Sequence, residues 1–416
     1  MFRQIIEQDI EYNLQHLPQI IFEVTDACNL RCKYCAYADL YEGYDDRTNL
    51  KFPFHKAKLI LDYLHNIWKK IFVKDVVTPF TVGFYGGEPL LNVPFIKQVM
   101  EYVESLEQTG KKIHYSMTTN AILLDKYMDF LAEKKVQLLI SLDGDKEGQS
   151  LRVDSNGKNS FQRVFKNIKL LQEKHPEYFD KFVRFNSVLH NKNSVESTYR
   201  FIKETFGKEP AINTLSTSGI RPDKVEEFNR TYRNYNESIQ QASNCESLKN
   251  EMFINNPETN MMLNYLYFHS GNVFFRYNDL LLRKSALTIP VTGTCIPFSK
   301  KMFITVKGRI LPCERINHEF SFGEITDTNV RLDWTQTAEQ HNHYIFKYAK
   351  QCRRCANQLS CSQCIYQIDS IHEEHTKCDS FRTMEQKRKE HEKCLRHLTK
   401  HPDLYYRLLN EVVVRG

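Results

Sequence analysis

Between residues 18 and 215, short apolar runs alternate with longer segments in which apolar residues recur at helical spacing. The pattern predicts strands at 20–24, 80–85, 113–119, 136–142, 182–189 and 211–216, and helices at 54–71, 93–106, 124–134, 161–174 and 195–206. Such alternation implies parallel strands joined by right-handed crossovers. Six units are fewer than the eight of a closed barrel, so we expect an α/β fold with a partial (β/α)6 TIM-like barrel or an open sheet.

Composition narrows the class of protein. The 416 residues suggest two to three domains, and 41% apolar with 26% charged residues is typical of a globular chain. The formal net charge of +6 is scattered, which gives no reason to expect a nucleic-acid partner. No apolar run approaches the ~18 residues of a membrane span, and acidic residues occur where a signal peptide would be apolar. We therefore expect a cytoplasmic protein with no membrane partner.

The 12 cysteines are clustered. Cys28, Cys32 and Cys35 form one group, Cys245 stands alone, and the other eight lie between residues 295 and 394. Because cytosolic thiols stay reduced, clustered cysteines in such a chain are metal ligands more often than disulfides.

The first group has the spacing C-x3-C-x2-C and follows the first predicted strand directly. In an α/β sheet, that position is the carboxyl end of the strand, where cofactors bind. Three thiolates on one loop can hold three corners of a 4Fe–4S cube and leave one iron open. The alternatives are a zinc knuckle with a distant fourth ligand, or three unrelated buried cysteines.

Four landmarks follow successive predicted strands: CNLRCKYC (28–35), FYGGEPLLN (84–92), TTNAILL (118–124) and SLDGDKEGQSLRVDSNGKNSF (141–161). In this order they resemble the radical S-adenosylmethionine (radical SAM) enzymes. The resemblance covers roughly residues 18–215. It implies that Cys28, Cys32 and Cys35 bind a 4Fe–4S cluster whose open iron chelates S-adenosylmethionine, and that the two cofactors generate a 5′-deoxyadenosyl radical.

The same resemblance implies contacts to S-adenosylmethionine. The residues concerned are Tyr34, Gly86, Gly87, Glu88, Ser141, Arg152 and Asn186. The two glycines lack side chains, so the backbone can approach the methionine ammonium closely, and Glu88 adds a negative charge near it. Arg152 is expected to bind the methionine carboxylate, with one residue fewer before it than is usual in the family.

The later cysteines resemble the SPASM extension of some radical SAM enzymes. They run Cys295-x12-Gly308-x4-Cys313, then Cys352-x2-Cys355-x5-Cys361-x2-Cys364, then Cys378. The segment TCIPFSKKMFITVKGRILPCERI (294–316) resembles the β-hairpin of that extension. The family usually has three residues before the sixth cysteine, and this chain has two.

The resemblance implies two auxiliary 4Fe–4S clusters. Cys295, Cys313 and Cys364 would bind the first, and Cys352, Cys355, Cys361 and Cys378 would bind the second. The first cluster then has three cysteine ligands, and its fourth ligand is not assigned. The fourth iron could bind another side chain, or it could stay open and bind a substrate thiolate. Taken without the N-terminal group, the C-x2-C pairs would instead favour a zinc ribbon.

These patterns divide the chain into a radical SAM core (1–216), a bridging region (217–290), a SPASM domain (291–380) and a charged helical tail (381–416). The resemblance implies a maturase that cross-links a ribosomally synthesised precursor peptide through a thioether or carbon–carbon bond. The alternative is an anaerobic sulfatase-maturating enzyme that forms formylglycine, and a third hypothesis is a zinc-binding adaptor without catalysis. Expected partners are the precursor peptide and an electron donor of flavodoxin or ferredoxin type. Because about 18 residues before the first strand are too few for a leader-binding domain, the leader is expected to bind a separate protein, the bridging region or an exposed strand edge. No catalytic acid or base can be assigned.

Overall fold

The computed structural model describes residues 4–74, 76–107, 109–269 and 292–412, and the contacts divide the chain into two compact units. The barrel unit comprises residues 5–239 and 295–340, and the tail unit comprises residues 1–4, 240–294 and 341–416. The contact division therefore splits the predicted SPASM segment between the units, and the predicted domain boundaries stay a prediction. Residues 270–290 of the predicted bridge, residue 291 and residues 413–416 of the tail lie outside the described residues.

Among the described residues, ten strands form one sheet in the barrel unit, in the order β10-β9-β8-β7-β1-β2-β3-β4-β5-β6. Their bounds are β1 Gln19–Thr25, β2 Thr78–Gly86, β3 Lys111–Thr119, β4 Gln137–Ser141, β5 Val183–Leu189, β6 Ala211–Thr214, β7 Met302–Ile304, β8 Arg309–Leu311, β9 Gly323–Ile325 and β10 Val330–Arg331. Strands β1 to β6 are parallel, each paired with the next in the chain. This confirms the predicted partial (β/α)6 barrel.

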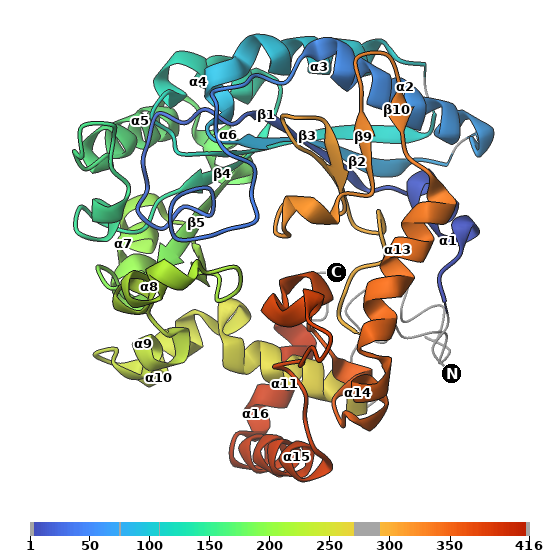
Figure 1. Ribbon diagram of the computed structural model, residues 1–416. Coiled ribbons are helices and arrows are strands. Elements are labelled where there is room, and N and C mark those ends of the chain that lie inside the picture. The colour runs from blue at the N-terminus through green and yellow to red at the C-terminus, as the bar shows by residue number, and fades with distance from the viewer. Residues whose placement is uncertain (1–3, 75, 108, 270–291, 413–416) are drawn as a thin grey trace. The chain divides into compact units, whose positions relative to one another are not determined.

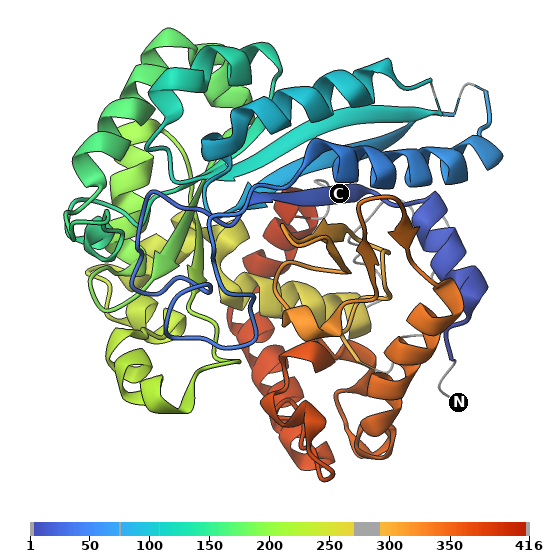
Figure 2. The same cartoon turned by 45° about the horizontal axis from the view of Figure 1, so that its top comes forward.

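Helices cover the outer face of the parallel strands (Figures 1 and 2). Their bounds are α2 Phe54–Lys70, α3 Val93–Ser105, α4 Leu124–Glu133, α5 Phe161–Lys174, α6 Pro176–Phe182 and α7 Val195–Phe206, with α1 Glu7–Gln15 before the sheet and α8 Val225–Thr231 and α9 Tyr235–Gln240 after it. The ends of α7 follow from its sequence. Ser194 caps its start by accepting a hydrogen bond from the Ser197 N–H at 3.0 Å, and Gly207 ends it with a φ of 67°.

The predicted hairpin of the SPASM segment is present, and it extends the barrel sheet. Strands β7 and β8 are antiparallel, with Phe303 opposite Leu311. Strand β7 also pairs in parallel with β1, with Met302 opposite Ile20. Helix α13, Trp334–Lys347, follows the last strand. The sequence pattern predicts the hairpin but not its addition to the sheet.

The tail unit is helical. Its helices are α10 Cys245–Glu251, α11 Pro257–His269, α14 Ala349–Arg354, α15 Met384–Lys400 and α16 Pro402–Arg407. The predicted helical tail is interrupted between α15 and α16 at His401, because the residue before a proline is disfavoured in the helical conformation. None of the helices in the described ranges is long and apolar enough to span a membrane.

Candidate active site

The cysteine loop follows β1 and lies against the segment that follows β4. The Arg31 N–H donates to the Val153 carbonyl at 2.6 Å, and the Lys33 N–H donates to the Leu151 carbonyl at 3.0 Å. Main-chain bonds to a neighbouring segment therefore fix the path of this loop.

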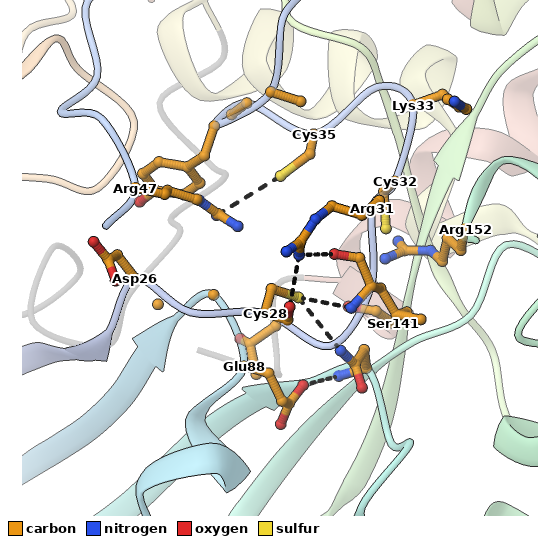
Figure 3. Close-up of a pocket in the computed structure, with 18 of the residues that line it drawn as sticks. Asp26, Cys28, Arg31, Cys32, Lys33, Cys35, Arg47, Glu88, Ser141 and Arg152 are labelled. Atoms are coloured by element: carbon orange, nitrogen blue, oxygen red, sulfur yellow. Dashed lines mark hydrogen bonds between the residues drawn. The ribbon is translucent and has the colours of Figure 1, made fainter. Parts of the chain in front are cut away.

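Cys28, Cys32 and Cys35 line one cavity of about 550 Å³, here called the cluster cavity (Figure 3). Its wall also contains Gly86, Gly87, Glu88, Ser141 and Arg152. The volume lies within the ~300–1,000 Å³ range of small-molecule sites. The fold therefore brings the three thiols together with five of the seven residues predicted to contact S-adenosylmethionine.

Burial determines the protonation of these thiols. It raises the pKa of Cys28, and it raises the pKa of Cys32 to about 12 although the Arg152 charge opposes the shift. Such a thiol is protonated at neutral pH, whereas iron binds the thiolate and favours loss of the proton. The three thiols are only partly buried, so they can face a bound group. This donor set fits a 4Fe–4S cluster.

The two glycines after β2 permit a close approach between backbones. Gly86 has a φ of 129°, and a Cβ atom there would lie 2.2 Å from the Thr25 carbonyl oxygen. A Cβ on Gly87 would lie 2.0 Å from the Ala27 carbonyl oxygen. The Gly87 N–H donates to the Thr25 carbonyl at 2.8 Å. The glycines thus hold the end of β2 against the residues that lead into Cys28, and their contact with the methionine ammonium stays a prediction.

Glu88 is fully buried and ties β2 to β3. Its carboxylate accepts from the Thr119 hydroxyl at 2.7 Å, from the Asn120 N–H at 2.8 Å and from the Leu90 N–H at 3.1 Å. Burial raises its pKa to about 7, and these three donors limit the shift. The carboxylate therefore has a structural role, and its predicted interaction with a methionine ammonium stays a prediction.

Arg152 forms a buried ion pair with Asp143, which lies two residues after Ser141. Its Nε and Nη2 atoms donate to the two carboxylate oxygens of Asp143 at 2.8 and 3.1 Å. Burial opposes ionisation of Asp143, but Arg152 and His190 outweigh it and lower the pKa to about 2. Two of the five guanidinium N–H groups are used here, so Arg152 keeps donors for a second carboxylate.

Two predicted contact residues do not line the cluster cavity. Tyr34 is buried, and its hydroxyl donates to Asp143. Its ring lies 5.4 Å from the Arg152 guanidinium carbon. Asn186 on β5 lies opposite Ser141 in the sheet, and its side-chain oxygen accepts from the Asn213 amide at 2.8 Å. The structure thus gives Tyr34 a role in supporting the Asp143–Arg152 pair.

Two residues that the sequence prediction missed reach the cysteine sulfurs. The Asn120 amide donates to Cys28 Sγ at 3.7 Å, and Arg47 Nη2 donates to Cys35 Sγ at 3.8 Å. Hydrogen bonds to ligand sulfurs help to set the potential of an iron–sulfur cluster. Asn120 lies in the landmark TTNAILL, which gave a signal, whereas no sequence pattern singles out Arg47.

A second group of thiols gathers in the tail unit. Cys352, Cys355, Cys361 and Cys378 line one cavity of about 20 Å³. Burial, with the three neighbouring thiols, raises the pKa of Cys352 to about 12. These are the four predicted ligands of the second auxiliary cluster. Nowhere in the described ranges do three or more His, Cys, Asp or Glu side chains converge as they would around a single metal ion.

The three predicted ligands of the first auxiliary cluster are divided between the units. Cys295 and Cys313 lie at the two ends of the segment that forms the β7–β8 hairpin, in the barrel unit, and Cys364 belongs to the tail unit. The Arg315 N–H donates to Cys313 Sγ at 3.4 Å. Their shared ligation stays a prediction.

Comparisons with known proteins agree with this fold. The radical SAM superfamily matches residues 22–205, and the SPASM iron–sulfur cluster-binding domain matches residues 295–364. A cysteine-type anaerobic sulfatase-maturating enzyme of Clostridium perfringens (strain 13 / Type A) is 28% identical over 357 residues, which are 82% of this chain and 86% of the relative. The radical SAM cyclopropyl synthase TigE of Paramaledivibacter caminithermalis is 26% identical over 183 residues, 42% of this chain and 36% of the relative. The solved structure of native anSMEcpe with bound AdoMet has a TM-score of 0.61 and 20% identity, covering 94% of this chain and 99% of that one.

The chain is therefore a radical SAM enzyme with a C-terminal SPASM domain. Its cofactors are S-adenosylmethionine and 4Fe–4S clusters. The predictions of family, fold, enzyme class and cofactors are confirmed. The assignment of individual side chains to those cofactors stays a prediction.

Proposed function

We propose that this enzyme oxidises a side chain of a peptide substrate, beginning with removal of a hydrogen atom from carbon. The observation that carries the proposal is the cluster cavity, in which three thiols of one loop lie beside Ser141 and Arg152. When bound there, the cluster and S-adenosylmethionine supply the 5′-deoxyadenosyl radical. A peptide substrate is supported by the relatives that mature sulfatases and by a solved structure of similar fold, native anSMEcpe with bound AdoMet and Kp18Cys peptide.

In this proposal, the residues of the chain bind and orient the two cofactors. Cys28, Cys32 and Cys35 would hold the cluster and leave a position for the methionine moiety. Arg152, fixed by Asp143, would bind the methionine carboxylate with its remaining N–H groups. Because the radical is reactive, a site held by buried bonds also limits side reactions.

The first candidate reaction is a thioether or carbon–carbon cross-link in a ribosomally synthesised precursor peptide. It is favoured by the three cysteines predicted for the first auxiliary cluster, since the nearest further cysteine upstream, Cys245, is 50 residues from Cys295. With only three cysteine ligands, the first auxiliary cluster would have a free iron position that a substrate thiolate could occupy. The peptide loses two hydrogen atoms: one enters 5′-deoxyadenosine, and the other leaves as a proton and one electron for an acceptor.

The second candidate is formation of formylglycine from Ser or Cys. It is favoured by the similarity to a cysteine-type anaerobic sulfatase-maturating enzyme over 82% of this chain. In both reactions the same hydrogen abstraction comes first. A donor of flavodoxin or ferredoxin type would reduce the cluster, and a separate protein would present the leader of a precursor peptide.

The test is anaerobic reconstitution with iron and sulfide, followed by dithionite, S-adenosylmethionine and candidate peptides. We expect 5′-deoxyadenosine, and a peptide product that distinguishes the candidates. A cross-linked peptide loses two hydrogens and does not react with a hydrazine, and in a thioether product the thiol also no longer reacts with iodoacetamide. A formylglycine peptide reacts with a hydrazine, and it has lost its sulfur where the modified residue was Cys. Colourless protein that contains zinc and forms no 5′-deoxyadenosine would contradict the proposal.

A further inference from the structure

The inner face of the barrel sheet has a second cavity, toward the amino ends of the strands. It measures about 610 Å³ and is lined by Gln19 of β1, Gly83 of β2, Ser116 of β3, Gln137 of β4 and Arg184 of β5. In the register, Gly83, Ser116 and Gln137 lie opposite one another. Gln19 and Arg184 lie two residues from that level, because Ile21 pairs with Gly83 and Leu139 pairs with Arg184. Tyr85 and Thr118 line both this cavity and the cluster cavity. The two cavities therefore adjoin across these two side chains.

The charges around this second cavity are unbalanced. Its lining contains four basic residues, Lys181, Arg184, Lys301 and Arg315, and one acidic residue, Glu314. We call it the cation-lined cavity. The cluster cavity differs, because its lining has four acids, Asp26, Asp39, Glu88 and Glu227, and four bases, Arg31, Lys33, Arg47 and Arg152.

The single acid is already bound. Glu314 pairs with Lys301 at 3.0 Å, and both side chains are largely buried, at 15% and 27% exposure. Arg315 lies 4.0 Å from the same carboxylate and is 73% exposed. Glu314 therefore compensates the inner lysine and leaves the outer cations with little neutralisation.

Arg184 and Lys181 have no acid partner inside the cavity. Arg184 donates Nη1 to the main-chain oxygens of Asp180 and Val183 at 3.2 and 2.8 Å, and it forms no ion pair within the described residues. Lys181 lies 3.7 Å from Glu177, which is 90% exposed on the same helix. The Asp180 carboxylate is bound instead to Lys208 at 3.0 Å.

We propose that the cation-lined cavity binds an acidic segment of the substrate peptide. Arg184, Lys181 and Arg315 receive its carboxylates, while Gln19 and Gln137 offer neutral hydrogen-bond partners. Guanidinium groups suit carboxylates because their N–H groups match the two oxygens, and a cavity of one charge sign raises the local concentration of an opposite ligand. Since the adjoining cavity is where the radical is generated, the acidic segment would flank the residue that reacts. This inference rests on the proposed function and names the substrate class.

The experiment measures binding separately from catalysis. A fluorescein-labelled peptide with one cysteine flanked by glutamates is titrated anaerobically with the reconstituted holoenzyme, and matched peptides carry glutamine or lysine at the same positions. We expect the glutamate peptide to bind about tenfold more tightly than the glutamine peptide, and the lysine peptide most weakly. The variant Lys181→Gln/Arg184→Gln should abolish that preference.

Two controls isolate the charge effect. Lys126→Gln/Lys166→Gln removes two exposed lysines from helices α4 and α5 and should leave the preference unchanged. Arg184→Lys keeps the charge and should retain most of the preference, which assigns the effect at this position to charge. Formation of 5′-deoxyadenosine by the double variant itself shows that the variant is folded. Equal binding of the three peptides, no binding of any of them, or an unchanged preference in the double variant would overturn the inference. Formation of 5′-deoxyadenosine by the same preparation, measured without peptide, reports on the proposed function independently.

Discussion

The two cavities on the inner face of the barrel sheet are similar in size but differ in how their polar groups are satisfied. In the cluster cavity, acids and bases are equal in number, and the lining residues Glu88 and Arg152 are buried in bonds to the chain itself, Arg152 to Asp143. In the cation-lined cavity, the bonds of Arg184 within the described residues go to main-chain oxygens, and the basic residues outnumber the one acidic residue. The fold thus fixes the geometry of the cavity where we propose that the radical forms. It leaves charge available in the cavity where we propose that a peptide binds.

This difference predicts two kinds of mutational effect. Changes in the cluster cavity should damage radical formation or the fold, because its groups support one another. Changes in the cation-lined cavity should alter which peptide binds and leave the chemistry intact.

The largest effect is expected for a cysteine of the loop. Cys28→Ala removes one of the three thiols that we propose as iron ligands, so formation of 5′-deoxyadenosine should fall to background. The matched control is Cys245→Ala, which removes a partly exposed thiol at the start of α10 and should retain full activity. The product is quantified by liquid chromatography, and cluster content by iron analysis and electron paramagnetic resonance. Equal activity in both variants would separate the radical chemistry from this loop.

Asp143→Asn should lower the free energy of unfolding by about 3–5 kcal/mol, because it leaves the Arg152 charge buried without a partner. The control Asp125→Asn breaks the pair with Arg163, which is half-exposed, and should cost less than about 1 kcal/mol. Urea unfolding under nitrogen measures both. If the two variants lost similar amounts of unfolding free energy, the buried Asp143–Arg152 pair would not be what stabilises this side of the cluster cavity.

The same pair gives a pH dependence. The pKa of Asp143 is lowered to about 2, so its stabilisation is present above the ordinary aspartate pKa and is lost as pH falls through about 2. The acid-induced loss of stability should therefore be smaller in Asp143→Asn than in the unmodified enzyme.

Gly87→Ala should cost about 2–4 kcal/mol, since its Cβ would lie 2.0 Å from the Ala27 carbonyl oxygen and displace the segment that leads to Cys28. Gly157→Ala is the matched control. Gly157 has a φ of 76°, but no atom lies within 4 Å of its Cβ position, so it should show only the backbone cost of about 1 kcal/mol. A smaller effect at Gly87 than at Gly157 would contradict the close approach of the two strand ends.

Much of the barrel could be predicted from sequence because its periodic patterns are strong and local. The helices predicted at 161–174 and 195–206 have the bounds of α5 and α7, and the other predicted elements differ from the structure by a few residues. Helices α1, α6, α8, α9 and α13 of the barrel unit were not predicted. Helix α13 reads WTQTAEQHNHYIFK, in which few apolar residues mark a face. The pairing of β7 with β1 joins residues 282 positions apart, such as Ile20 and Met302, so no local pattern reveals it.

The candidate site also has a part that the sequence predicts and a part that it does not. The thiols and glycines could be predicted because the site requires these residue types at this spacing along the chain. Asp143 lies inside a landmark that was identified, together with Arg152, its partner nine residues further along. Its role also depends on Tyr34 from the cysteine loop, and sequence order does not show that these three side chains meet. The cation-lined cavity gave no signal, since its four basic residues come from α6, β5 and the loops that flank the β7–β8 hairpin.

The smallest expected effect is a difference in salt dependence between the two cavities. Raising NaCl from ~0.1 M to ~1 M shortens the screening length from about 10 Å to about 3 Å. The preference for the glutamate peptide should shrink from about tenfold to about twofold, because Lys181 and Arg315 are solvent-exposed. Formation of 5′-deoxyadenosine without peptide should change little, since the Asp143–Arg152 pair is buried and screened far less. The Lys181→Gln/Arg184→Gln variant should show almost no salt effect on peptide preference. If 5′-deoxyadenosine formation fell as steeply with salt as the peptide preference, both cavities would depend on screened surface charges. The proposed difference between them would then be wrong.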